Sequence, residues 1–150
     1  MVKRFLLLAV AMAAPAAAFT PELQGVEETI ERIGTKVLWS MGYPECRQGI
    51  LGFYRPSIDT VIICQGNHRR NVAELLSTLK HEGWHAVQRK CNNNRAALRD
   101  DQIRPYLNRN DRVNLHRYHP KQQRAEAEAR VVEQIPTTAW IRGVKTYCDL

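Results

Sequence analysis

Residues 71–90 read NVAELLSTLKHEGWHAVQRK, and their pattern predicts a long helix with two different faces. Asn71 is a residue type that commonly caps a helix N-terminus, and apolar residues recur after it at helical spacing as far as about Lys90. One side of this helix carries Val72, Leu75, Leu76, Leu79, Gly83 and Val87. His81 and His85 lie almost opposite, which indicates that the two histidines are not part of the apolar core.

The polar face of this helix contains the motif HEGWH at residues 81–85. The i, i+4 spacing puts the imidazoles of His81 and His85 one turn apart on the same face, where both can coordinate one Zn²⁺ ion. Glu82 is the neighbouring carboxylate that could act as a catalytic base on a metal-activated water. Gly83 lies on the apolar side and is interpreted as a packing position. The alternative is a solvated polar face that holds no metal.

A catalytic zinc site usually takes three protein ligands, so a third ligand must come from another segment. The metzincin pattern requires a histidine at position 91, where this chain has Cys91. Residues 121–134 predict a later helix that contains two glutamates, Glu126 and Glu128. Periodicity places Glu128 amid the apolar face of that helix, where a carboxylate needs a partner, and Glu126 on its polar side. From periodicity alone, both glutamates remain candidates.

Together, HEGWH and the later ExxA at residues 126–129 resemble the gluzincin type of zincin metallopeptidase over roughly residues 50–136. The resemblance implies a Zn²⁺ cofactor, hydrolysis of a peptide or protein substrate, and Glu126 as the third ligand, with Glu128 as the alternative. It also suggests that Tyr118 or His119 donates to the developing oxyanion. Arg130 departs from the pattern, because several such families place Asp or Asn there. The export signal and the cysteines described below are further departures.

The N-terminus predicts an export signal at residues 1–18. Basic residues precede an apolar run over residues 5–13, and small residues at Ala16 and Ala18 favour cleavage after Ala18. The run is shorter than the roughly 20 residues of a membrane span, so no stable span is expected. We therefore expect a single domain over residues 19–150 that is secreted or periplasmic.

Four cysteines follow the predicted signal: Cys46, Cys64, Cys91 and Cys148. An even number of cysteines in an exported chain favours two disulfides. Of the three possible connectivities we favour Cys46–Cys64, which would clamp a hairpin, and Cys91–Cys148, which would tie back the C-terminus. The spacings match no cysteine zinc site.

The remaining segments predict an α+β fold that is mostly helical, a minimal zincin-like domain with a short hairpin packed on the HExxH helix. A helix is expected over residues 21–41 and a hairpin from residues 50–54 and 60–64. A further helix is expected over residues 96–108 with a break near Pro105, followed by irregular chain to Pro120 and a short final segment after Pro136. His68, His116 and His119 are expected at the surface.

The net charge of the chain and the HEGWH motif are compatible with more than one function. The formal net charge is +7, but the basic residues are scattered, so nucleic-acid binding is not expected. The basic charge hints only weakly at acidic substrates. The alternative to a peptidase is a secreted zinc-binding or disulfide-stapled interaction domain without catalytic activity. The sequence predicts neither the cleavage specificity nor the oligomeric state.

Overall fold

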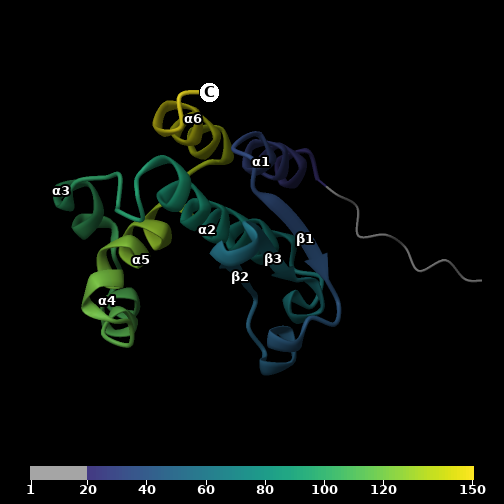
Figure 1. The fold of residues 1–150 in the computed structure, drawn as a ribbon. Helices are drawn as coiled ribbons and strands as arrows, with labels where there is room; N and C mark the ends of the chain where they lie inside the picture. The colour runs from purple at the N-terminus through teal and green to yellow at the C-terminus, as the bar shows by residue number, and fades with distance from the viewer. Residues whose placement is uncertain (1–19) are drawn as a thin grey trace, which may run out of the picture.

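The computed structural model describes residues 20–150, and the predicted signal, residues 1–18, lies outside this described part. The fold is α+β, as expected, with six α-helices and a three-stranded sheet in the described residues (Figure 1). The helices are α1 (Pro21–Arg32), α2 (Val72–Cys91), α3 (Asp100–Ile103), α4 (Arg109–Leu115), α5 (Pro120–Val132) and α6 (Thr137–Tyr147). The strands are β1 (Lys36–Ser40), β2 (Gly52–Arg55) and β3 (Thr60–Cys64). Short 3₁₀ turns cover Pro44–Gln48, Pro56–Ile58, Gln65–His68 and Arg104–Tyr106.

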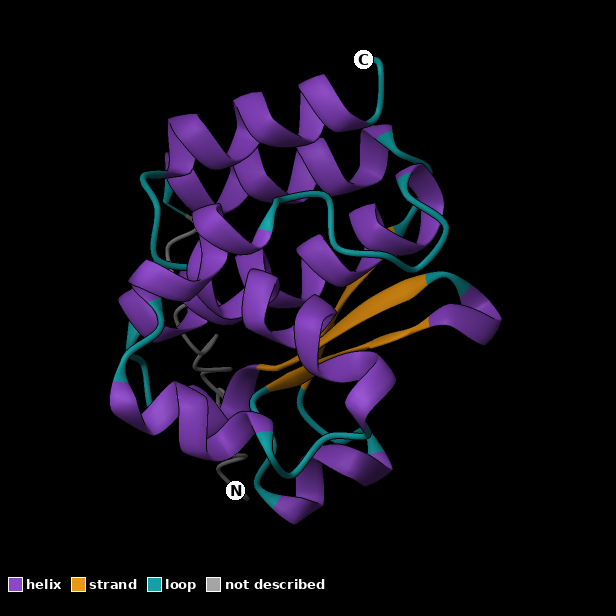
Figure 2. Cartoon of the chain, turned by 90° about the vertical axis from the view of Figure 1, so that its left-hand side faces the viewer, coloured by secondary structure: helices purple, strands orange, loops and turns teal. Residues whose placement is uncertain are grey.

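The sheet has the strand order β1-β3-β2, and its central strand β3 is buried along its whole length. β2 and β3 are antiparallel, which confirms the predicted hairpin, whereas β1 pairs with β3 in parallel. β2 is an edge strand, and α2 packs against both β2 and β3. The sheet lies to one side of the helices (Figure 2). This arrangement places one edge of the sheet beside the helix that carries HEGWH.

The core is built around α2, which contacts α1, α5, α6 and the sheet. Leu79, Trp84 and Val87 of α2 are buried against Ile30 of α1 and Trp140 of α6. The predicted packing role of Gly83 is confirmed, because a Cβ at this position would lie 2.6 Å from Cδ1 of Ile30. The helix begins as predicted, since the side chain of Asn71 accepts a hydrogen bond from the backbone N–H of Glu74.

Three predictions of secondary structure are wrong. The helix expected over residues 21–41 ends at Arg32, because Gly34 has a φ of +79° and the chain then enters β1. The helix expected over residues 96–108 is reduced to α3 and a 3₁₀ turn, and the stretch before Pro120 is not irregular, since it contains α4. The final segment is the three-turn helix α6, held by burial of Trp140 and Val144.

Both predicted disulfides are present, Cys46–Cys64 and Cys91–Cys148. The first joins the 3₁₀ turn after β1 to the end of β3 and so lies beside the hairpin. The second joins the C-terminal end of α2 to the residue after α6. Within residues 20–150, none of the helices has the length and apolar character needed to cross a bilayer.

Candidate metal centre

Helix α2 holds His81 and His85 on the face that meets α5, so neither imidazole is fully open to solvent. Their side chains are 13% and 24% exposed. The Nε2 atoms of the two rings face each other at 3.2 Å. The prediction that the histidines lie outside the apolar core is confirmed, but they do not sit on a solvated face.

Glu126 of α5 completes the group with His81 and His85. Its Oε1 lies 3.4 Å from Nε2 of His81, and its Oε2 lies 3.2 Å from Nε2 of His85. One ligand atom from each of the three residues lies within 4.8 Å of the other two, which is close enough to hold a metal ion. We call His81, His85 and Glu126 the candidate metal centre, shortened below to the metal centre.

The donor set of the group fits a divalent metal cation. Two imidazole nitrogens and one carboxylate are ligands that Zn²⁺ takes in catalytic sites. Oε1 of Glu126 is buried and forms no well-aligned hydrogen bond among the described residues, and its contacts there are ion pairs with His81 and Arg130, so a cation could bind it as well. Both Nδ1 atoms are engaged elsewhere, that of His81 by Glu133 and that of His85 by Gln88. The Nε2 atoms are therefore the ones directed at the metal centre.

Glu128, the alternative candidate, lies away from this group. It is completely buried and accepts hydrogen bonds from the backbone N–H groups of Ala97 and Leu98 and from the side chain of Gln88. The expectation that a carboxylate on the apolar face needs a partner is confirmed. Between the two candidate ligands, it is Glu126 that the structure brings to the histidines.

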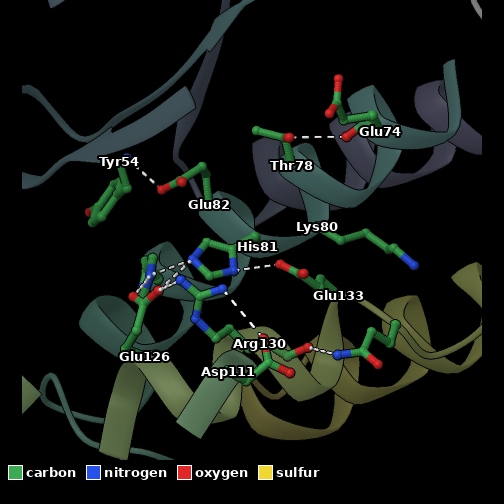
Figure 3. Close-up of polar contacts among 12 residues, drawn as sticks. Tyr54, Glu74, Thr78, Lys80, His81, Glu82, Asp111, Glu126, Arg130 and Glu133 are labelled. Atoms are coloured by element: carbon green, nitrogen blue, oxygen red, sulfur yellow. Dashed lines mark hydrogen bonds and ion pairs between the residues drawn. The ribbon is translucent and has the colours of Figure 1, made fainter. Parts of the chain in front are cut away.

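The charged groups of the metal centre shift one another's pKa values in the direction that favours the charged forms. Burial alone would lower the pKa of His81, but its contacts with the carboxylates of Glu126 and Glu133 outweigh burial and raise that pKa to about 10. Burial alone would raise the pKa of Glu126, but the two imidazoles hold it well below its usual value. His81 stands between the two carboxylates in Figure 3. Without a metal, His81 is therefore an imidazolium and Glu126 a carboxylate at neutral pH.

Arg130 lies one turn after Glu126 on α5 and contacts it directly. Its guanidinium is 3.2 Å from Oε1 of Glu126 and 3.6 Å from Oδ1 of Asp111 on α4 (Figure 3). Burial lowers the pKa of Arg130, but the nearby charge of Glu126 outweighs it and raises that pKa. The position where the sequence resemblance leads one to expect Asp or Asn thus carries a cation, which contacts the candidate ligand Glu126.

A cleft of about 350 Å³ opens onto the metal centre. Its walls come from α2, from the start of β2 and from α5. Tyr118, which precedes α5 in the chain, also lines the cleft. The lining residues are Leu51, Gly52, Glu74, Ser77, Thr78, His81, Glu82, Tyr118, Glu126, Arg130 and Glu133.

Glu82 lines this cleft and turns toward the edge strand. Its Oε2 accepts a hydrogen bond of 3.0 Å from the backbone N–H of Tyr54 in β2 (Figure 3). Of the two predicted oxyanion donors, Tyr118 lies in the cleft, but His119 is exposed and accepts a hydrogen bond from the backbone N–H of Lys121 at the start of α5. The cleft therefore combines the metal centre, one further carboxylate and one phenol.

Sequence reasoning missed two residues that contact the histidines, Glu133 and Gln88. A signal for both existed in their spacing, because Glu133 lies seven residues after Glu126 and Gln88 three residues after His85, which places each on the same helix face. The prediction for His68 is wrong, since its side chain is buried and Nε2 lies 3.0 Å from the carbonyl oxygen of Leu51. His116 is exposed, as expected.

Comparison with known proteins gives one match. A protein-family profile described as "Domain of unknown function (DUF8637)" matches residues 22–149. Within residues 20–150, the match covers the helices and strands apart from Pro21, the first residue of α1, and it includes every residue of the metal centre. No match was found among curated proteins or among solved structures.

Proposed function

We propose that this chain, which belongs to the family described as Domain of unknown function (DUF8637), is an exported zinc-dependent peptidase of the gluzincin type. The observation that carries the proposal is the convergence of His81, His85 and Glu126 beside a cleft whose lining includes His81, Glu126 and Glu82. A HExxH pair with a glutamate from a later helix is the donor set that this type of peptidase uses.

Each residue has a definite task in the proposed reaction. His81, His85 and Glu126 would hold the metal. A bound Zn²⁺ would supply Lewis acidity for the scissile carbonyl and for a water molecule. Glu82 would serve as the general base that takes a proton from the attacking water and then donates it to the leaving amine. The hydrogen bond from the Tyr54 backbone to Glu82 fixes one carboxylate oxygen, so the base has a defined orientation before substrate binds.

The edge strand beside the cleft supports an extended peptide as substrate. Leu51, just before β2, and Gly52, the first residue of β2, line one wall, and an extended segment can bind beside an edge strand by backbone hydrogen bonds. The net charge of the chain hints at acidic substrates, but the cleft does not favour them. Its walls carry Glu74, Glu82, Glu126 and Glu133. Two disulfides support an oxidising, extracellular location for the reaction.

A second candidate function is a secreted domain that binds zinc without turnover. It is favoured by the same Tyr54–Glu82 hydrogen bond, because a carboxylate engaged by the backbone has one oxygen fewer for proton transfer. A disulfide-stapled interaction domain that binds no metal is the third outcome to be tested.

The experiment is a comparison of four forms of the mature chain purified without chelator: wild type, His81→Ala, Glu82→Gln and the control His116→Ala. We expect one equivalent of zinc in wild type, Glu82→Gln and His116→Ala, and none in His81→Ala. We expect cleavage of a mixed peptide library by wild type and His116→Ala only. Zinc without cleavage in wild type would favour the second candidate, and wild type without zinc after addition of the metal would favour the third.

A further inference from the structure

Glu128 is a completely buried carboxylate that the proposed reaction does not use. We propose that Glu128 and Gln88 are positioning residues that fix the tautomer and orientation of His85, and that they couple the backbone at residues 97–98 to the metal centre. This inference rests on the metal centre proposed above, but one of its readouts does not require metal.

The direction of every hydrogen bond in this chain of contacts is fixed by chemistry. The backbone N–H groups of Ala97 and Leu98 can only donate, and they donate to the carboxylate of Glu128 at 2.9 and 3.0 Å. The side chain of Gln88 is 3% exposed and has two neighbours that accept, Oε2 of Glu128 at 3.0 Å and the carbonyl oxygen of Ala125 at 2.9 Å. The nitrogen of the Gln88 amide must therefore face these two acceptors.

The orientation of that amide determines the state of His85. With its nitrogen directed at Glu128 and Ala125, Gln88 presents its oxygen to Nδ1 of His85 at 2.9 Å. Nδ1 must then carry the hydrogen, which leaves the lone pair of a neutral imidazole on Nε2. Nε2 is the atom that faces Glu126 and His81. The two acceptors of Gln88, Glu128 and Ala125, thus select the tautomer that leaves Nε2 free to bind a metal, and the backbone at residues 97–98 contributes by holding Glu128 in place.

The same contacts restrain His85 in space. Gln88 lies one turn after His85 on α2, and Glu128 lies on α5, so the chain of contacts joins the two helices that carry the metal ligands. The same contacts hold the segment after α2 in place, since Glu128 accepts hydrogen bonds from the backbone N–H groups of Ala97 and Leu98. Partners of metal-binding histidines typically change metal affinity by about 10- to 100-fold when they are removed.

The test uses Gln88→Met, which keeps the length of the side chain but cannot accept the His85 hydrogen. Glu128→Gln is the second variant, and Gln24→Met, an exposed glutamine in α1, is the matched control. The first readout is the ¹⁵N chemical shifts of the His85 ring in the metal-free protein at alkaline pH. We expect the Nδ1–H tautomer in wild type and control, and a mixture of both tautomers in Gln88→Met.

The second readout is zinc affinity by competition with a chelator. We expect a loss of about 10- to 100-fold in Gln88→Met, a loss in Glu128→Gln, and a double variant that is no weaker than the weaker single one, because both act through one chain of contacts. If Glu128→Gln fails to fold, Gln88→Met alone decides, since it leaves the backbone donors to Glu128 in place. An unchanged tautomer, or zinc affinity within twofold of wild type in Gln88→Met, would overturn the inference. Failure of wild type to bind zinc would refute the proposed function instead, and the tautomer readout would still apply.

Discussion

Nδ1 of His81 lies 2.6 Å from Oε2 of Glu133, so the imidazole is held by a charged acceptor on the side opposite the metal centre. A carboxylate in this position orients a histidine ligand and makes its free nitrogen a better donor to a metal. We expect Glu133→Leu to weaken zinc binding by about 10- to 100-fold, and Glu133→Gln to weaken it less, because an amide oxygen still accepts.

Zinc affinity in these two variants is measured by competition with a chelator. Glu31→Leu, at an exposed position of α1, is the matched control and should bind zinc as wild type does. Equal affinities for Glu133→Leu and wild type would show that the contact does not support the metal centre.

The raised pKa of His81, about 10, predicts how the metal-free protein responds to alkali. Its folded pKa lies above the ordinary 6.5, so the contribution to stability is complete below pH 6.5 and is lost as the pH rises towards 10. The lowered pKa of Glu126 acts in the other direction, and its contribution is present above pH 4.5 and is lost as the pH falls further. We therefore expect the free energy of unfolding to fall between pH 6.5 and 10.

Urea unfolding in the presence of chelator measures this stability at each pH. Zinc must displace the proton on His81, so zinc affinity should rise over the same range and binding should release protons into the buffer. The Glu133→Gln variant should show a shallower pH dependence. A flat stability profile for the metal-free wild type, or zinc binding without proton release, would contradict this account of His81.

The parts of the fold that could be predicted are those determined by local pattern. The helix from Asn71 onward, the hairpin and the cysteine pairing all follow from spacing and turn residues close in sequence. Residues 36–40 could not be assigned in this way, because Val37 and Leu38 continue the helical spacing of α1. They form a strand because they pair with Thr60–Cys64, a contact that periodicity does not detect.

The metal centre, like the sheet, could be predicted only in the part that depends on local sequence pattern. Spacing within one helix predicts that His81 and His85 share a face, but it does not predict how α5 is rotated against α2. That rotation is set by tertiary contacts, among them the backbone N–H groups that hold Glu128 in the core. Periodicity left Glu126 and Glu128 as alternatives for this reason, and only the resemblance favoured Glu126.

Tyr118 lies in the cleft beside Glu126 and Arg130. Its pKa is raised, first by burial and then by the charge of Glu126, so the phenol stays protonated and remains a donor. If it stabilises the oxyanion, Tyr118→Phe should lower kcat by about 10²- to 10³-fold and leave zinc content and KM nearly unchanged. Peptide cleavage rates measure this effect, with Tyr106→Phe, at an exposed position, as the control. Full turnover in Tyr118→Phe would remove Tyr118 from the mechanism.

The Cys91–Cys148 disulfide closes the larger of the two loops, with a sequence separation of 57 residues. In the chain-entropy estimate, removing it by Cys91→Ser with Cys148→Ser should cost about 4 kcal/mol, against about 3 kcal/mol for Cys46 and Cys64. Urea unfolding of the two double variants tests the order. Because Cys91 ends α2, we also expect removal of the Cys91–Cys148 disulfide to weaken zinc binding more than removal of Cys46–Cys64. The reverse order of zinc affinities would show that the C-terminal end of α2 does not support the metal centre.

Gly83 and Gly143 are both helical glycines next to tryptophans of the core, but they differ in the space available. A Cβ at Gly83 would lie 2.6 Å from Cδ1 and 2.9 Å from Cγ1 of Ile30, and 3.2 Å from Cζ2 of Trp140. A Cβ at Gly143 would meet Trp84 at 3.5 Å, which is an ordinary contact. Alanine gains about 1 kcal/mol over glycine in a helix interior, whereas overpacking a core costs about 1–3 kcal/mol.

We expect Gly83→Ala to lower the free energy of unfolding by roughly 1 kcal/mol, because Ile30 is fully buried and cannot move aside freely. Gly143→Ala should raise it by up to about 1 kcal/mol. The midpoints of urea unfolding, compared at constant m-value, measure both changes. A Gly83→Ala variant as stable as Gly143→Ala would mean that α1 can shift away from α2. In that case, the close approach at residue 83 would not be what sets the position of the HEGWH helix against the core.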